Sequence, residues 1–148
     1  MVLELIALLC TGLFAGAAVY VTLVEHPARL ECGPAVALAE FRPSYRRAAA
    51  MQASLAAVGL LTAVGAWALG RSVPVLVAGL LLGAMIPFTL LVVLPTNKRL
   101  LDPALDPCSA EAASLLAHWG RLHAVRSAAS VVAFVLLGFD LARALHPR

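Results

Sequence analysis

The stretch Leu5–Val24, with the sequence LIALLCTGLFAGAAVYVTLV, contains no charged residue, and Glu25-His26-Pro27-Ala28-Arg29 follows it directly. As an α-helix rising 1.5 Å per residue, a run of this length crosses a hydrocarbon core of ~30 Å. Glu4 stands before the run, where a signal peptide would carry basic residues, so we expect a permanent membrane span. The acid, imidazole and guanidinium at its end are groups that can hold a proton, a metal ion or an anion.

The rest of the chain repeats this apolar pattern. Hydrophobic residues make up 62% of the sequence and charged residues 13%, whereas soluble domains average about half and about a quarter. The apolar residues form four blocks, over about 3–25, 44–70, 74–94 and 109–145. Because backbone amides in hydrocarbon must be paired within the protein, each block should be a helix. We therefore predict an all-α integral membrane protein, a four-helix bundle with a single transmembrane domain over 1–148.

Proline residues set the expected ends of these helices. Pro27 disfavours helical geometry at the preceding residue, so the first helix should end or kink there. An extended first loop would then carry a short helix over 35–41, too short to span the membrane. Pro87 should kink the third span, which stops at Pro95-Thr96-Asn97. The fourth span is on the order of 55 Å long, so its first third, up to Arg126, should stand outside the hydrocarbon or line a polar cavity.

Lysine and arginine residues are distributed unequally between the two ends of the bundle. Arg71, Arg143 and Arg148 belong to the end with the chain termini. The end with the first and third loops holds Arg29, Arg42, Arg46, Arg47, Lys98, Arg99, Arg121 and Arg126. The positive-inside rule places the loops over 25–47 and 95–110 in the cytoplasm and both termini outside, in an inner or plasma membrane. Arginines that belong to a functional site should not count, which leaves the orientation open.

The sequence gives weaker indications about other binding partners and about disulfide bonds. A net charge of +3, without a basic stripe interleaved with aromatic residues, argues against nucleic-acid binding. Cys32 and Cys108 fall in loops on the same side and could form a disulfide if that side is oxidising. Gly12 and Gly16 give the first span a face of small residues, which could join helices within the bundle or between protomers of a homo-oligomer.

Polar residues from all four spans should meet at one end of the bundle. The groups are Glu25-His26-Arg29, Tyr45 with Gln52, Thr96-Asn97, and Trp119-His123-Arg126. The last three are spaced i, i+4 and i+7, so they share one helical face. An imidazole and a guanidinium at membrane depth are costly, and such residues are functional-site hypotheses by default.

Several of these residues also have a purely structural interpretation. Trp119 could be an aromatic anchor at the membrane interface. Glu25 could pair with Arg29 or Arg126 and neutralise both charges. Asn97 could cap a turn after the proline.

The histidines allow two kinds of site. Glu25, His26 and His123 could supply three ligands to a metal ion, but nearby arginines would repel a cation. Positive charge beside a histidine suits an anionic substrate better. The histidine would act as a base, and the guanidinium would stabilise the enolate or phenolate that deprotonation creates.

Four motifs follow one another along the chain. They are Tyr20-x4-Glu25-His26-Pro27-x-Arg29, Phe41-x-Pro43-x-Tyr45, Pro95-Thr96-Asn97 and Trp119-x3-His123-x2-Arg126. In this ordered set the chain resembles the anthrone oxygenase-like family of small four-span membrane proteins. The resemblance covers nearly the whole chain and implies a four-helix membrane bundle with an extended first loop. Some members of the family are linked to the oxidation of anthrones to anthraquinones by O2.

The resemblance implies an oxygenase-like enzyme that acts on a hydrophobic planar phenol or quinol with O2. An anthrone methylene is acidic because its carbanion delocalises into an aromatic alkoxide, and that anion can react with O2 without a metal. No cofactor is therefore expected. His123, on a rigid mid-helix face, is the expected base, and His26, near a proline, is its expected partner. The other expected catalytic residues are Arg126, Arg29 and Glu25, and the expected substrate-binding residues are Tyr45, Gln52, Asn97, Trp119 and Tyr20.

Two other functions remain open. A metal- or haem-binding redox protein would use His26 and His123, with Glu25 as a third metal ligand. A non-catalytic bundle would bind a lipid, a quinone or a partner protein in the same place. Metal content and an absorption spectrum of the purified protein would separate these alternatives.

Overall fold

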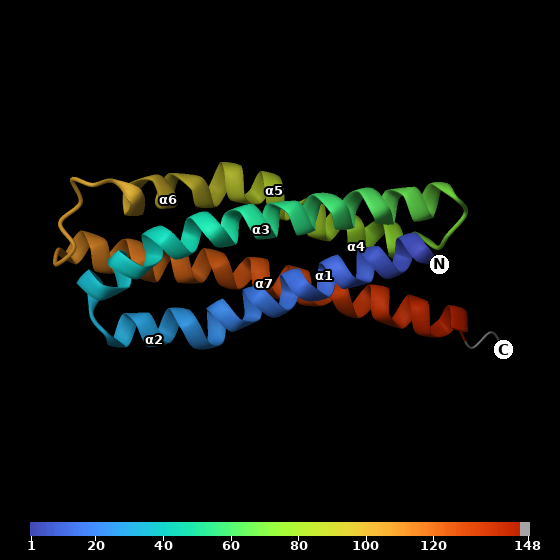
Figure 1. The fold of residues 1–148 in the computed structure, drawn as a ribbon, viewed down its shortest axis with the longest axis horizontal. Coiled ribbons are helices and arrows are strands. Elements are labelled where there is room, and N and C mark those ends of the chain that lie inside the picture. The colour runs from blue at the N-terminus through green and yellow to red at the C-terminus, as the bar shows by residue number, and fades with distance from the viewer. Residues whose placement is uncertain (146–148) are drawn as a thin grey trace.

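The computed structural model describes residues 1–145, which form four long helices packed side by side and contain no strand (Figure 1). The first span comprises α1 (Val2–Tyr20), the π-helical turn η1 (Val21–Glu25) and α2 (His26–Glu31), and the second is α3 (Pro34–Ala68). The third comprises α4 (Val73–Gly83), α5 (Met85–Phe88), the π-helical turn η2 (Thr89–Val93) and α6 (Leu94–Leu101), and the fourth is α7 (Ala110–Leu145). All four are long and apolar enough to cross a membrane, which confirms the predicted all-α membrane fold.

The first and third spans continue as helices through Pro27 and Pro95. The end expected at Pro95 is therefore wrong, and of the end or kink expected at Pro27 the end does not occur. In each span the residue just before the proline donates its N–H to the carbonyl five positions back, which is a π-helical bond. Proline lacks an N–H, and its ring clashes with the carbonyl four residues back in an α-helix. A wider π turn directly before the proline relieves this crowding, so the helix bends instead of stopping.

The connection between the first two spans is shorter than expected. Gly33 has a φ of +86°, a left-handed conformation that favours glycine, and Pro34 stands in the first turn of the next helix. The stretch 35–41 is helical, as predicted, but it forms the first turns of α3 instead of a separate short helix in an extended loop. Pro43 lies inside the same continuous helix. The second span therefore begins at Pro34 and not near residue 44.

The third span breaks close to Pro87, as predicted. Helix α4 ends at Gly83, and Ala84 forms a turn before α5. Pro87 cannot donate to the carbonyl of Gly83, four residues earlier, so the α-helical ladder is interrupted there. Thr89 does not compensate for that bond, because its hydroxyl donates to the carbonyl of Met85 at 2.6 Å.

Glycines hold the third span close to the second before this break. A Cβ on Gly79 would lie 2.3 Å from the Cβ of Ala63, and one on Gly83 would lie 2.7 Å from a methyl carbon of Leu60. Only glycine allows such a close approach of the two helices. Beyond α4 the third span runs farther from α3, as the separated ribbons of α6 and α3 show (Figure 1).

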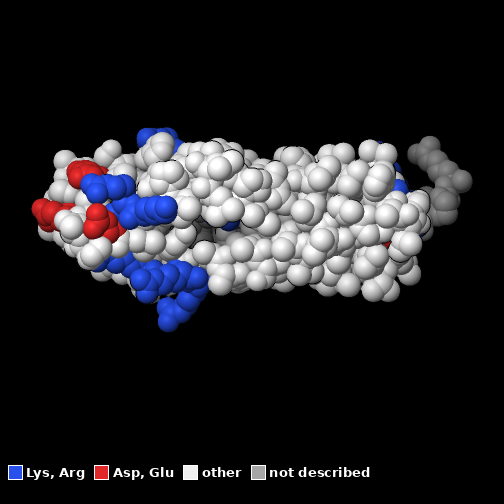
Figure 2. Space-filling view, turned by 90° about the horizontal axis from the view of Figure 1, so that it is seen from above, with Lys and Arg blue, Asp and Glu red and all other residues white. Residues whose placement is uncertain are grey.

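The fourth span begins where the sequence predicts. The N–H of Ala112 donates to the Oγ of Ser109 at 3.1 Å, so Ser109 caps the helix, and Glu111 lies in its first turn. With 36 residues, α7 is the longest element of the described chain. It packs against α1 and η1 of the first span, and its N-terminal third reaches the end that carries most of the charge (Figures 1 and 2).

Charged side chains cluster at one end of the molecule and leave the midsection nearly uncharged on the face seen in Figure 2. At the other end Arg71, between α3 and α4, pairs with Glu4 of α1 at 2.7 Å. The hydrogen bond that Arg71 donates to this carboxylate, and the Coulomb attraction between the two groups, raise the pKa of Arg71 above its usual value. Arg148, counted with this end in the sequence, lies outside the described residues. The orientation in the membrane stays a prediction.

The small residues of the first span and the three cysteines lie in different environments. A Cβ on Gly12 would lie 2.9 Å from the ring of Phe134, so Gly12 packs within the bundle, whereas a Cβ on Gly16 would meet nothing within 4 Å. Cys32 and Cys108 are exposed free thiols, and Cys10 is a buried one.

Candidate functional site

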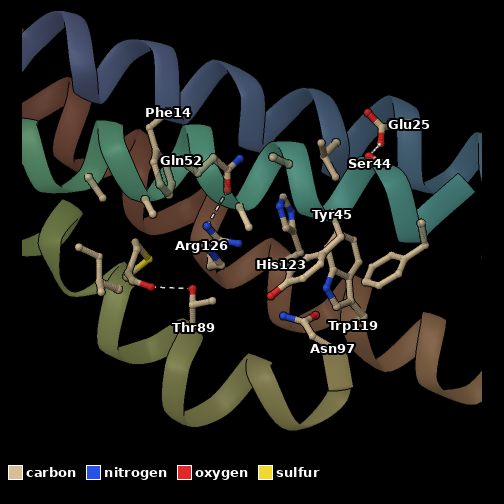
Figure 3. A pocket seen from close by; sticks show the side chains of 18 of the residues that line it. Phe14, Glu25, Ser44, Tyr45, Gln52, Thr89, Asn97, Trp119, His123 and Arg126 are labelled. Atoms are coloured by element: carbon tan, nitrogen blue, oxygen red, sulfur yellow. Dashed lines mark hydrogen bonds between the residues drawn. The ribbon is translucent and has the colours of Figure 1, made fainter. Parts of the chain in front are cut away.

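A cavity of about 180 Å³ lies between the four spans, toward the charged end of the molecule (Figure 3). Eight of the residues predicted for the site line it: Glu25, Arg29, Tyr45, Gln52, Asn97, Trp119, His123 and Arg126. The lining comes from η1 and α2, from α3, from α5 to α6 and from α7, so every span contributes. Segments far apart in the sequence therefore meet at one end, as predicted.

Alanines of α3 create the empty space. The cavity face of this helix carries Ala48, Ala49, Ala53 and Ala56 at helical spacing, with Gln52 among them. An alanine side chain extends no farther than its Cβ, so this wall stays close to the backbone and leaves room opposite α7. Phe14, Met85 and Ile86 close the inner end of the cavity with apolar surface. Such a space suits a flat apolar molecule.

The two π turns aim polar residues into the cavity in the same way. Each turn is followed by a proline, and the residue two positions after that proline lines the cavity: Arg29 after Pro27 and Asn97 after Pro95. Asn97 is fully buried, and neither its amide nitrogen nor its amide oxygen has a partner in the described chain. A buried amide without partners carries a desolvation cost. A ligand in the cavity could supply both hydrogen bonds.

His123 is held by a chain of hydroxyl groups behind it. Its Nδ1 is 3.0 Å from the Oγ1 of Thr22, which is 2.7 Å from the Oγ of Ser127. Ser127 has a single hydroxyl hydrogen, and two carbonyl oxygens can accept it, that of Ala18 at 2.9 Å and that of His123 at 3.3 Å. With that hydrogen on a carbonyl, Thr22 donates to Ser127 and accepts from Nδ1–H of the imidazole. Assigned from this network, the ring hydrogen is on Nδ1, and Nε2 carries the lone pair of a base.

Trp119 organises the aromatic wall of the cavity. Its ring stacks on His123 with centroids 4.7 Å apart, and Phe41 meets it edge-on at 5.2 Å. The ring of Tyr45 in turn stacks on Phe41 at 5.7 Å. The indole Nε1 of Trp119 is buried and has no hydrogen-bond partner in the described chain. These rings offer flat surfaces and one free donor to a planar ligand.

Arg126 is a cation without a carboxylate beside it. Its guanidinium donates to the Oε1 of Gln52 at 2.6 Å and lies 5.4 Å from the ring of Phe14, and its Nε has no partner (Figure 3). Among residues 1–145, no ion pair joins Arg126 to an acid. A guanidinium in an apolar cavity favours an anionic ligand, because the anion would neutralise a charge that the protein leaves uncompensated.

Arg29 differs from Arg126, although both were expected to hold an anion. Arg29 pairs with Glu25 and, at 2.8 Å, with Glu40. Ser44 also donates to the carboxylate of Glu25 at 3.1 Å. The positive charge of Arg29 is therefore already balanced, and the interpretation of Glu25 as its counter-ion holds. Both residues line the cavity, but their opposite charges neutralise each other.

Two predicted residues lie elsewhere. Tyr20 is 56% exposed on the outer surface and does not line the cavity. His26 is buried behind Trp119, with the two ring centroids 5.1 Å apart, and it also lies outside the lining. A metal site made of Glu25, His26 and His123 is not assembled, since no group of three possible ligands occurs within residues 1–145.

The sequence interpretation missed the residues that position the site. Thr22 and Ser127 hold His123, yet isolated hydroxyls inside apolar spans give no signal of their partners. The alanines over 48–56 could have been recognised, because small residues at helical spacing mark a close approach or a cavity. The prolines at 27 and 95 were visible in the sequence, but a π turn before each of them was not.

Comparison with known proteins identifies the family of this chain. The chain is 39% identical over 70 residues to the anthrone oxygenase tpcL of Aspergillus fumigatus, a match that covers 45% of this chain and 44% of that protein. No solved structure matches the chain. The profile of the family described as anthrone oxygenase matches residues 41–136, a region that contains Tyr45, Asn97 and His123. The match leaves out the first of the four motifs, over 20–29, but the family expected from the motifs is confirmed, and the chain belongs to the anthrone oxygenase family.

Proposed function

We propose that this protein is a membrane-embedded oxygenase that oxidises the acidic methylene of an anthrone-like planar phenolic substrate with O2. Membership of the anthrone oxygenase family supports an oxygenase-like activity in general. One observation carries the finer proposal: the free Nε2 of His123 and the unpaired guanidinium of Arg126 line the same apolar cavity. A base and an uncompensated cation are the two groups that formation of a carbanion requires.

The first step is proton removal. Nε2 of His123 takes one methylene proton, and the negative charge moves into the ring system onto the oxygen as a phenolate. In this proposal Arg126 stabilises the oxyanion, and the amide of Asn97 and the indole N–H of Trp119, which have no partner in the described chain, hydrogen-bond to the substrate oxygens. The stacked rings of Trp119 and His123 hold the substrate plane.

Reaction with O2 then completes the oxidation. The anion transfers an electron to O2, and the two radicals combine into a C–O–O bond at the former methylene carbon. Protonation of this peroxide by the histidinium, followed by loss of the second methylene proton and cleavage of the O–O bond, gives a carbonyl group and water. In total, CH2 and O2 become C=O and H2O, so the substrate is oxidised by four electrons and O2 is reduced by four.

We propose that no resident cofactor takes part, because the chemistry needs only a base, an anion site and O2. The alternative is a metal- or haem-dependent redox protein. Purified protein in mild detergent should turn over anthrone at the same rate with and without a chelator. A stoichiometric metal or a Soret band, together with loss of turnover after chelation, would overturn the cofactor-free reaction.

The helix that carries the proposed base offers a matched test of its role. His118 is exposed on α7, whereas His123 is 3% exposed on the cavity face. His123→Gln should lower anthrone-dependent O2 uptake by about 10²–10⁴-fold, the usual contribution of a general base. His118→Gln should leave it unchanged. Equal rates in the two variants would show that His123 is not the base.

A non-catalytic bundle that binds a quinone would give a different outcome. Such a protein would bind anthraquinone in the cavity, but it would not accelerate anthrone oxidation above the rate in detergent alone. Binding without turnover in the wild-type protein would therefore favour that alternative.

A further inference from the structure

We propose that the cavity opens sideways into the bilayer between α3 and α5–η2, and that the substrate reaches His123 from the lipid through this opening. The substrate class rests on the proposed function, but the opening itself rests on the geometry described below. Leu90 and Ala53 form its two edges.

Packed side chains block the path along the bundle axis from the water at the charged end. Between that end and the cavity lies a core cluster that includes Leu38, Phe41, Leu100 and Leu116, and none of these side chains is more than 1% exposed. Arg42 links α3 to the end of α6 beside this cluster, since its guanidinium donates to the carbonyl of Asp102 at 3.0 Å. A planar molecule could not pass here without separating packed helices.

The opposite direction is closed as well. Phe14 and Ala56 line the inner end of the cavity and are each 1% exposed, and Leu82 behind them is fully buried. The close glycine contacts between α4 and α3 continue from there toward the termini. The cavity therefore has no route along the bundle axis at either end.

The side of the cavity is different, because residues that line it are also exposed on the outer surface. Leu90 of η2 is 56% exposed, and Ala53 of α3 is exposed too. Figure 2 shows a hollow in the uncharged midsection with a basic side chain at its bottom. Arg29 and Arg126 are the arginines that line the cavity. The interior is thus reached from the side of the bundle.

The sequence explains why the opening lies here. The break at Ala84, caused by Pro87, lets the third span move away from α3 just below the glycine contacts. The facing positions on α3 are alanines, which cannot fill the gap. A kinked helix opposite a small-residue wall leaves a slot between two spans.

The surroundings of the slot are those of a lipid-facing surface. Next to Leu90, Leu91 is 77% exposed and Val92 is 44% exposed, and on α3 Met51 is 48% exposed. Arg47, the nearest charged residue before Ala53 on α3, lies six positions earlier, about 9 Å along the helix. The opening therefore lies deeper in the membrane than the charged groups. A flat apolar molecule with one ionisable oxygen would dissolve in the lipid at this depth.

Phenylalanine substitutions at the edge test this route, with matched controls on the same helix. Ala53→Phe should narrow the slot, whereas Ala50→Phe adds the same bulk at an exposed position outside the cavity lining. Each would be made in a Trp67→Phe background, so that Trp119 is the only tryptophan. In liposomes, 9,10-anthraquinone should quench Trp119 fluorescence more slowly in Ala53→Phe by at least about tenfold, which is about 1.4 kcal/mol on the barrier. Ala50→Phe should quench at the original rate.

A second substitution separates a blocked slot from a damaged fold. Leu90→Ala removes bulk from the opposite edge, so Ala53→Phe combined with Leu90→Ala should regain most of the quenching rate. Equal rates in Ala53→Phe and Ala50→Phe, or no recovery in the double variant, would overturn the lateral route.

The same experiments distinguish this inference from the proposed function. If anthrone turnover depends on His123 but quenching is equally fast in Ala53→Phe and Ala50→Phe, the lateral route fails and the proposed function stands. If Ala53→Phe slows quenching while wild-type protein fails to oxidise anthrone, the route stands and the proposed function fails.

Discussion

Thr22 on η1 and His123 on α7 are 101 positions apart in the sequence, and their Oγ1 and Nδ1 atoms lie 3.0 Å apart in the fold. The hydroxyl belongs to a π turn that exists because Pro27 follows it. Through this contact the proline of the first span determines which nitrogen of a histidine on the fourth span is free for a substrate.

Thr22→Val should lower kcat while changing KM little. The substitution keeps the shape of the side chain but removes the acceptor for Nδ1–H, so the imidazole loses its fixed tautomer. We expect a decrease of about ten- to a hundredfold, part of the contribution of a general base. Thr22→Ser should restore most of the rate. Nitrogen NMR of the imidazole should show a mixture of tautomers in the valine variant only; an unchanged spectrum would contradict the positioning role of Thr22.

Gln52→Glu should weaken binding of anionic ligands. The new carboxylate would stand where an amide oxygen now accepts from Arg126 at 2.6 Å, and it would neutralise the guanidinium from within. We expect the affinity for a hydroxyanthraquinone phenolate to fall about tenfold or more, or about 1.4 kcal/mol. Gln52→Met, which removes the hydrogen bond without adding charge, is the control. Quenching of Trp119 fluorescence measures the affinity of both variants for this ligand. Equal losses of affinity would mean that the added charge is not the cause.

Pro95→Ala should convert the π turn η2 into regular α-helix. Because successive residues of an α-helix are rotated by about 100°, losing one residue of the bulge would turn Asn97 out of the cavity. Activity should fall as far as in Asn97→Ala, and the double variant should be no worse than either single one, which a double-mutant cycle measures. Pro74→Ala, at the start of α4 where no π turn occurs, should leave activity intact. Additive losses of activity would show that Pro95 does not act through Asn97.

Gly120→Ala should destabilise the bundle. The added Cβ would lie 2.5 Å from Nε2 of His26, which is packed against Trp119. Overpacking of this kind costs about 1–3 kcal/mol. Gly138→Ala on the same helix meets no atom within 4 Å and should be neutral or stabilising. Thermal unfolding in detergent compares the two variants, and His26→Ala should rescue Gly120→Ala if the clash is the cause.

The sequence was sufficient for the spans and for one face of the site. Long uncharged runs can only be helices in hydrocarbon, so the four spans follow from composition and length. The i, i+4, i+7 spacing of Trp119, His123 and Arg126 placed them on one face, because helical periodicity is a local property. The structure brings all three to the cavity as expected.

The tertiary structure decided where the helices bend and which charges stay unpaired. Pro27 and Pro95 could have ended their helices, and only packing against the other spans makes a π turn the better solution. Arg29 and Arg126 look alike in the sequence, yet Glu25 and Glu40 reach one and no carboxylate reaches the other. Hydrophobicity and helical period act over a few neighbouring residues, so the sequence determined the spans. Ion pairing depends on distances between segments far apart in the chain, so only the fold decided which arginine is left for a ligand.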